Sequence, residues 1–276
     1  ESERKPDPME VMPGSDYPSN ISGFPSAWLD RAYEVDAYGG FNASSTELGI
    51  DDAWKAVCGL LAEANIDVKA ELNADKTAVE AKANVSFPLE INNARYGVEF
   101  VLVADGLTGT ADGWTQKNYY AKGKNGTDFS EPEFEQFIKG DGYVSGLVFD
   151  DVAVATTRLT GENQYLPEAI EEDKVYELPA TFQLAKVKNT SGENIVQNAD
   201  NLRVVAVLID YNDGTVVNAA KTLRLGEATG IKGVNADEDG KPVEIYDLSG
   251  RRLNSMQQGL NIVKTADGRT SKIIVK

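Results

Sequence analysis

Histidine is absent from this sequence of 276 residues, and cysteine occurs once, at Cys58. Without histidine there can be no Ser-His-Asp or Cys-His nucleophile pair, no histidine metal site and no histidine general base. With one cysteine, these residues can form neither an internal disulfide nor a zinc site built from cysteines. Any catalysis by this sequence would depend on carboxylates, lysine or tyrosine. Nothing in the sequence selects a pair of carboxylates as the acid and base of a glycosidase.

Long apolar runs are also missing, and positive charge is scarce. No run approaches the roughly 18–20 residues that a membrane-spanning helix needs. The first residues, ESERKPDPME, are charged and rich in proline, unlike a signal peptide, which indicates a cytosolic chain or one already processed. The net charge of −17 argues against nucleic acid and anionic lipid as partners, because both require clustered basic side chains.

Three acidic stretches, DFSEPEFE, EAIEEDK and NADEDG, contain oxygen ligands that suit Ca²⁺. None of them has ligands at alternate positions followed by a closing glutamate, which is the spacing of the EF-hand loop. We therefore expect no metal site and no cofactor.

One segment has clear helical periodicity. In DDAWKAVCGLLAEA (51–64), Trp54, Val57, Cys58 and Leu61 recur at positions i, i+3, i+4 and i+7. This spacing predicts an amphipathic helix with its apolar side against the core. The place of Cys58 on that side favours a small buried side chain over a reactive thiol.

Most of the remaining sequence shows the period-two alternation of β-strands. Residues 66–72 and 77–87 alternate on either side of a turn and predict a hairpin with one solvated side. The turn YNDGT (211–215) joins two further apolar runs into a second hairpin. Because strands follow one another with almost no helix between them, we predict an antiparallel β-sandwich of immunoglobulin type.

A long polar loop, residues 107–128, interrupts the strand pattern. Loops of this length in compact domains are usually functional or mobile. The loop contains Trp114, Tyr119 and Tyr120, and two interpretations stay open. The rings form a ligand-binding platform for a carbohydrate or a peptide, or they fold back over the edge of the sandwich.

Two sequence blocks, GFPSAWLDR (23–31) and RYGVEFVLVADGLTGTADGWTQKNYY (95–120), resemble the outer membrane protein 28-related family of Bacteroidetes. Members of that family are envelope-anchored, usually as lipoproteins, and combine a thioredoxin-like part with a β-rich domain. The resemblance implies a partial thioredoxin-like segment with a cis-proline at Pro25. No C-x-x-C motif precedes Pro25, so thiol exchange by that mechanism lacks its second sulfur.

The C-terminal segment, residues 241–276, resembles C-terminal modules of secreted Bacteroidetes proteins, including type IX secretion sorting domains. The matching positions include Tyr246, Gly250, Arg251 and Gly259. Seven Lys and Arg against three Asp and Glu give this segment a charge of +4, so the other 240 residues carry −21. Alternating apolar residues predict three or four strands here, and the resemblance implies recognition by the secretion machinery.

Together these patterns predict a mainly β protein with a small α/β lead segment. The expected parts are a partial thioredoxin-like segment (1–65), a β-sandwich (66–228), a linker (229–240) and a C-terminal β unit (241–276). The leading hypothesis is a non-enzymatic protein of the outer membrane or cell surface, lipid-anchored or secreted. It would act in adhesion by binding an extracellular protein, peptide or glycan.

Two other hypotheses stay open. The chain is related to a thiol-disulfide oxidoreductase whose C-x-x-C half is absent from these residues, or it is an accessory module of a carbohydrate hydrolase.

Overall fold

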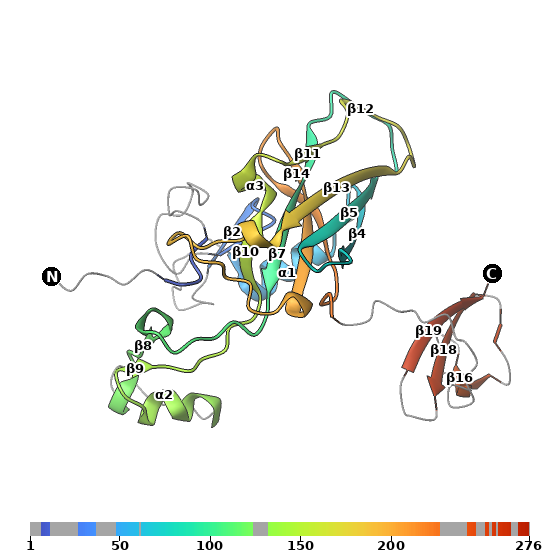
Figure 1. Cartoon of the computed structure of the whole chain (residues 1–276). Helices are drawn as coiled ribbons and strands as arrows, with labels where there is room; N and C mark the ends of the chain where they lie inside the picture. Colours follow the sequence, from blue (N-terminus) through green and yellow to red (C-terminus); the bar gives the residue numbers. More distant parts are fainter. Residues whose placement is uncertain are drawn as a thin grey trace. The chain divides into compact units, whose positions relative to one another are not determined.

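Strands dominate the computed structural model of the chain (Figure 1). The structure describes residues 7–11, 27–36, 48–60, 62–123, 132–226, 242–246, 252–253, 256–257, 259–265 and 270–275. The chain divides into two compact units, Glu1–Glu227 and Ala228–Lys276. Several antiparallel sheets and a few short helices make up the described residues, which confirms the prediction of a mainly β protein.

The first hairpin predicted from alternation belongs to a sheet with the strand order β13–β5–β4. β4 (Asn65–Leu72) pairs with β5 (Ala78–Ser86), and β13 (Tyr176–Gln183) pairs with the other side of β5. Apolar residues of β5 are buried, whereas Glu80 and Lys82 between them are exposed. One side of this sheet therefore faces a core and the other faces solvent, as predicted.

A second sheet has the order β10–β7–β14–β15, with a short strand, β11, also paired to β7. Its strands are β7 (Tyr96–Ala104), β10 (Val152–Thr156), β11 (Gln164–Tyr165), β14 (Leu202–Asp210) and β15 (Val216–Lys221). β7 is buried along almost its whole length, and β14 and β15 form the second predicted hairpin.

Both sheets contribute side chains to one hydrophobic core. Val79 and Val85 of β5 and Phe100, Leu102 and Leu208 of the second sheet have no solvent exposure. Burial of each such side chain stabilises the fold by about 1.5–3 kcal/mol. The immunoglobulin-type connectivity of a sandwich stays a prediction.

The described part of the lead segment is a small three-stranded sheet followed by one helix. β1 (Ala27–Leu29) and β2 (Tyr33–Asp36) are antiparallel, β3 (Leu48–Gly49) runs parallel to β2, and α1 (Ile50–Cys58) follows at once. The turn between β1 and β2 is tied to the second sheet, because the carbonyl oxygen of Asp30 accepts a 2.8 Å hydrogen bond from the start of β15.

The prediction for the helix was wrong in its extent and in its burial. α1 spans nine residues, and the N–H of Gly59 closes its last turn by donating to Ala56. Trp54 is 58 % exposed and Cys58 is exposed, so the expected burial of Cys58 is corrected. Ala53 is the residue of α1 that is buried. Among the described elements, α1 packs on the small sheet β1–β3, which leaves most of its apolar side uncovered.

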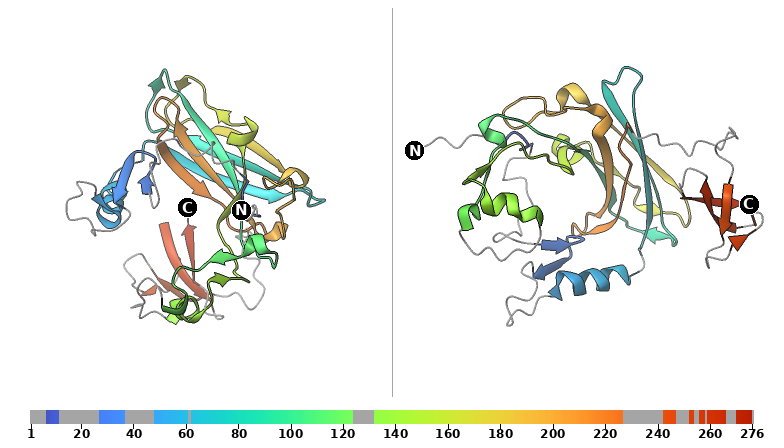
Figure 2. Two further views of the ribbon diagram at one scale, coloured as in Figure 1. Left: turned by 90° about the vertical axis from the view of Figure 1, so that its left-hand side faces the viewer. Right: turned by 90° about the horizontal axis from the view of Figure 1, so that it is seen from below.

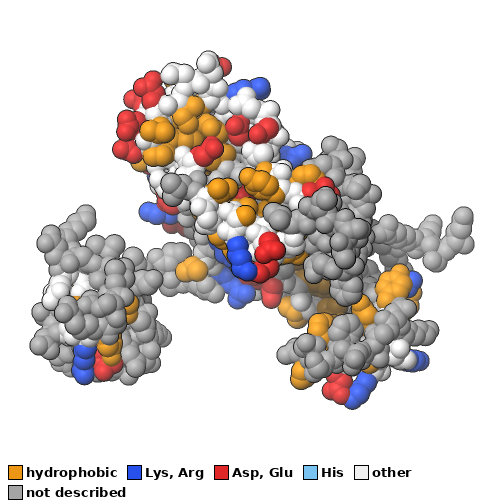
Figure 3. Space-filling view, turned by 180° about the vertical axis from the view of Figure 1, so that it is seen from behind, with side chains coloured by type: hydrophobic (Ala, Val, Ile, Leu, Met, Phe, Trp, Pro, Cys, Tyr) orange, Lys and Arg blue, Asp and Glu red, His pale blue; other side chains and the backbone are white. Residues whose placement is uncertain are grey.

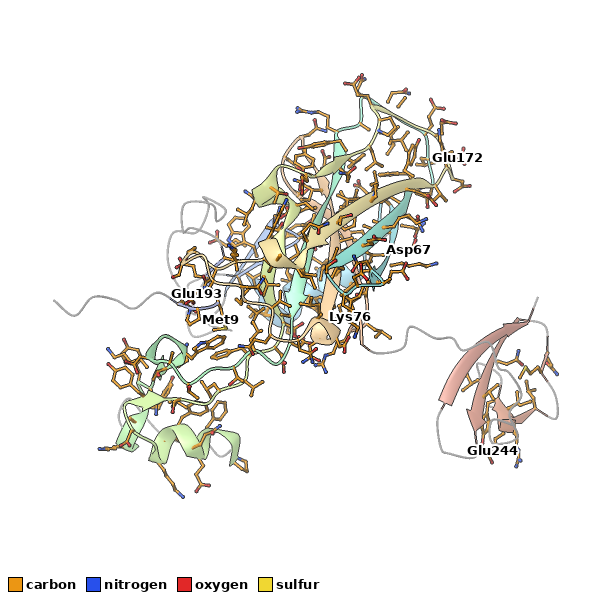
Figure 4. The ribbon with its side chains drawn as sticks, viewed as in Figure 1. Met9, Asp67, Lys76, Glu172, Glu193 and Glu244 are labelled. Atoms are coloured by element: carbon orange, nitrogen blue, oxygen red, sulfur yellow. The ribbon has the colours of Figure 1, made fainter. Side chains whose placement is uncertain are left out.

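A short N-terminal segment, residues 7–11, packs against the core of the first unit, to which it belongs. Met9 and Val11 contact its core, and the N–H of Thr190 donates to the carbonyl oxygen of Glu10 at 2.7 Å. Figure 4 shows Met9 close to Glu193, which follows Thr190 in the same loop.

The second unit forms a four-stranded antiparallel sheet in the order β17–β16–β18–β19. Its strands are β16 (Pro242–Tyr246), β17 (Arg252–Leu253), β18 (Gly259–Thr265) and β19 (Thr270–Val275). The strands predicted from the alternating apolar residues are therefore present. Asn261, almost fully buried, exchanges two hydrogen bonds with the main chain of Gln257 at 2.7 and 2.9 Å.

Candidate functional site

The predicted polar loop lies in a small folded insertion between β7 and β10, residues 107–149, which we call the lobe (Figures 1 and 2). Its elements are η2 (Asp112–Trp114), β8 (Gln116–Lys117), η3 (Ala121–Gly123), η4 (Pro132–Phe134), α2 (Glu135–Lys139) and β9 (Tyr143–Val144).

The two ends of the lobe are joined at its root. Leu107 and Phe149 exchange main-chain hydrogen bonds of 2.9 and 2.8 Å. Next to them, the N–H of Gly106 donates to a carboxylate oxygen of Asp150 at 2.8 Å. The lobe therefore enters and leaves the sheet at one point.

Asp105, the first residue after β7, is the centre of a buried ion network beneath the root. Its side chain is 1 % exposed and accepts hydrogen bonds from Arg203, from Arg224 Nε at 2.6 Å and from the N–H of Asp151 at 2.9 Å. Burial raises the pKa of Asp105, but these hydrogen bonds outweigh burial and hold the pKa well below its usual range. The carboxylate thus stays charged and holds both ends of the lobe.

Trp114 packs into the root. Its ring centroid lies 6.2 Å from that of Phe149, and Trp114 is half-buried against the core. A Cβ atom on Gly109 would lie 2.4 Å from Trp114 Nε1, so glycine is required for this close approach. The structure therefore places Trp114 in the packing at the base of the lobe.

Asn118 holds the outer part of the lobe together. Its side-chain nitrogen donates to the carbonyl oxygens of Phe137 at 2.7 Å and Asp141 at 3.0 Å. Its side-chain oxygen accepts from the N–H of Tyr120 at 3.1 Å, and its own N–H donates to Gly142 at 2.9 Å. One buried amide thus connects the residue before η3, the middle of α2 and the turn that leads into β9.

The other two predicted residues, Tyr119 and Tyr120, lie next to Asn118 and are exposed, Tyr119 by 61 %. Tyr143 in β9 is 67 % exposed, and Phe134 is exposed as well. Figure 3 shows hydrophobic side chains on the surface of the lobe, beside lysine and acidic side chains. The lobe thus presents several aromatic rings to solvent.

Lys117 connects two of these rings. It lies opposite Tyr143 in the β8–β9 pair, where cross-strand neighbours share one side of the ladder. Its Nζ atom lies 4.6 Å from the centroid of the Tyr119 ring, within range of a cation–π contact. Tyr119, Lys117 and Tyr143 therefore form one continuous exposed surface, which we call the Tyr–Lys–Tyr surface.

Sequence reasoning missed Lys117, Asn118 and Tyr143. Tyr143 lies 24 positions after Tyr119 in a segment without periodicity, and only the pairing of β8 with β9 brings it beside Lys117. For Asn118, the available clue in the sequence was its place directly before two tyrosines, in the stretch NYY (118–120).

The remaining predicted site residues lie elsewhere. Pro25, Gly250 and Arg251 are outside the described residues. Tyr246 is half-buried in β16 and its hydroxyl donates to Glu244 at 2.9 Å, and Gly259 begins β18.

The described residues contain neither a metal-ligand cluster nor a membrane-spanning helix. No group of three or more Asp, Glu, Cys or His side chains there is arranged to hold a metal ion. In the same part of the chain, no helix has the length and apolar character to cross a membrane.

Comparison with known proteins gives structural likeness without a sequence family. No protein-family model and no curated protein matches the sequence. The structure is similar to HBP35 of Porphyromonas gingivalis, with a TM-score of 0.44 and 13 % identity over 93 % of this chain and 77 % of that one. It is also similar to a domain of the outer membrane lipoprotein Omp28 from Porphyromonas gingivalis. That match has a TM-score of 0.28 and 15 % identity, over 59 % of this chain and 89 % of that domain.

Proposed function

We propose that this chain is a non-enzymatic protein of the outer membrane or cell surface, lipid-anchored or secreted, that binds an extracellular ligand through its lobe. The candidate ligands are a protein, a peptide or a glycan. The observation that carries the proposal is the Tyr–Lys–Tyr surface, in which two tyrosine rings are more than half exposed on a folded insertion.

The geometry of the lobe suits binding for two reasons. Tyrosine is enriched in binding surfaces because its ring contributes apolar area and its hydroxyl contributes a hydrogen bond. The hydrogen bonds of Asn118 and the joined root fix the main chain of the lobe that carries the two tyrosines before any ligand arrives. A surface ordered in advance loses less entropy when it binds.

The proposed location depends on the sequence. The blocks 23–31 and 95–120 resemble an envelope protein family, and residues 241–276 resemble modules that direct secreted proteins to the cell surface. Deletion of residues 241–276 followed by cell fractionation tests this location. An unchanged distribution of the shortened protein would contradict it.

The binding function can be tested with matched tyrosine variants. Wild-type protein, Tyr143→Ser and Tyr165→Ser are passed over immobilised matrix proteins, peptides and polysaccharides. Tyr165 is 63 % exposed and lies in β11, outside the lobe, so it controls for the loss of an exposed tyrosine. We expect Tyr143→Ser to weaken binding at least tenfold and Tyr165→Ser to leave it unchanged. Equal binding by all three proteins would exclude the lobe as the contact surface.

The oxidoreductase alternative gains one observation, the exposure of Cys58 on α1. An accessible thiolate can attack a disulfide and form a mixed disulfide with it. A single cysteine cannot then release the substrate by forming an internal disulfide, because that step needs a second cysteine. Insulin reduction by wild type and Cys58→Ser measures this activity, and turnover that depends on Cys58 would favour the alternative.

A further inference from the structure

The lysines of the lobe differ in their ionic partners. Lys139 pairs with Glu135, and Lys122 lies 3.6 Å from Asp141. Lys117 has no carboxylate within ion-pair distance among the residues that the structure describes. Its ammonium group instead lies against the ring of Tyr119.

An ammonium group in this position keeps the capacity to bind an anion. Lysine carries three N–H donors, and contact with the face of a ring does not use all of them. The ammonium group lies over one face of the exposed Tyr119 ring, and the cross-strand neighbour of Lys117 is the exposed Tyr143. A ligand that matches this surface carries an anionic group beside flat surfaces of C–H bonds, which can stack on tyrosine rings.

We infer that the ligand of the Tyr–Lys–Tyr surface is an acidic glycan, whose carboxylate or sulfate group binds Lys117 while its sugar rings stack on Tyr119 and Tyr143. This inference rests on the proposed binding function and names the ligand class of that same surface. Lys117 is then the residue that distinguishes charged from neutral sugars.

A glycan fits the geometry better than an acidic peptide. Peptides are commonly bound in an apolar groove or as an added strand at a sheet edge. β8 and β9 have two residues each, which is too short to accept an added strand of useful length. Sugar rings need only an exposed aromatic face and nearby polar groups, and the surface has both.

The negative charge of the whole chain does not prevent this contact. Exposed charges separated by more than about 8 Å are largely screened at physiological ionic strength. Within the lobe, the carboxylates of Glu135 and Asp141 are each matched by a lysine other than Lys117.

The test compares charged sugars with their neutral counterparts. Full-length protein is titrated with oligogalacturonate and its methyl ester, with sialyllactose and lactose, with a sulfated and a desulfated chondroitin oligosaccharide, and with a glutamate-rich peptide. We expect at least one acidic sugar to bind about tenfold more tightly than its neutral counterpart. Lys117→Met should remove that difference, whereas Lys117→Arg should keep it.

The possible results separate the two proposals. Equal binding of charged and neutral sugars, binding of the peptide in preference to all sugars, or absence of any sugar binding would overturn the acidic-glycan inference. If a matrix protein or a neutral sugar bound wild type but not Tyr143→Ser, the proposed binding function would stand and only the acidic-glycan inference would fail. If no ligand required Tyr143, the proposed function itself would fail.

Discussion

The root and the outer part of the lobe both contain ion pairs, but burial gives these pairs different roles. At the root, Asp105 is inaccessible to solvent and holds Arg203 and Arg224. In the outer part, Glu135 and Lys139 form an exposed pair one helical turn apart. An exposed pair contributes little because water screens it, whereas a buried charge that loses its partner is strongly destabilising. The ion pairs at the root therefore stabilise the fold, whereas those of the outer part contribute little to stability and leave its surface available to contact a ligand.

The largest effect should follow from removing the buried charge. Asp105→Ala removes the buried acceptor of Arg203 and of the N–H of Asp151, and it leaves Arg203 with the exposed carboxylate of Asp151. We expect the free energy of unfolding to fall by about 3–5 kcal/mol. Urea denaturation measures this loss. Asp151→Asn is the matched control, because the Asp151 carboxylate is 72 % exposed and lies 3.2 Å from Arg203, and asparagine tolerates the left-handed backbone at this position (φ 58°). A comparable loss in both variants would contradict the contrast between buried and exposed pairs.

The pH dependence of stability should also separate the root from the surface. The pKa of Asp105 is lower in the folded chain than the value of about 3.9 expected when unfolded. As the pH falls, the carboxylate of Asp105 is therefore protonated in the unfolded state before it is protonated in the folded state. The stabilisation of the fold by this carboxylate is complete above about pH 4 and is lost as the pH falls further.

Urea midpoints measured from pH 7 to pH 3 test this dependence. Wild type should lose stability more steeply in acid than Asp105→Asn, which lacks the titrating group. The difference between their urea midpoints should therefore become smaller as the pH falls. Parallel curves would show that Asp105 is not the group responsible.

A smaller and local effect is expected at Asn118. Asn118→Ala leaves the carbonyl oxygens of Phe137 and Asp141 without their donor, which costs about 1–3 kcal/mol. We expect faster hydrogen exchange at Tyr120 and its neighbours, with exchange in β7 and β14 unchanged, because the lobe opens without the sheets. Uniformly faster exchange in the sheets would mean that the lobe and the sheets unfold as one unit.

The smallest effect is expected at the exposed pair of α2. Lys139→Ala removes a pair between two solvent-exposed side chains, so the melting temperature should not change measurably. Calorimetry of wild type and variant provides the comparison. A shift of several degrees would show that the outer lobe depends on its charges as the root does.

The strands were the most predictable part of the fold. β4 and β5 follow from local alternation, since the residues that face the core are two positions apart in the sequence. The burial of α1 was not predictable in the same way. Its periodicity correctly indicated a helix, but the exposure of Trp54 depends on how much neighbouring structure covers it.

The candidate site could be predicted only in part. Tyr119 and Tyr120 are visible as aromatic residues in a polar segment, whereas Trp114 in the same segment packs into the root. The partners that complete the site are distant in sequence: Tyr143 reaches Lys117 through strand pairing, and Arg203 reaches Asp105 across 98 positions. No local pattern encodes contacts of that separation.

The joined root has a consequence for how this protein can change over time. Since Leu107 and Phe149 are already hydrogen-bonded to each other, the sheet presents the same two attachment points whatever chain runs between them. The entropy of closing a loop grows only slowly with its length. We therefore expect residues 115–146 to be exchangeable as a cassette, with new recognition surfaces evolved or grafted there while Trp114 keeps its packing at the root and β7 and β10 keep their sequence.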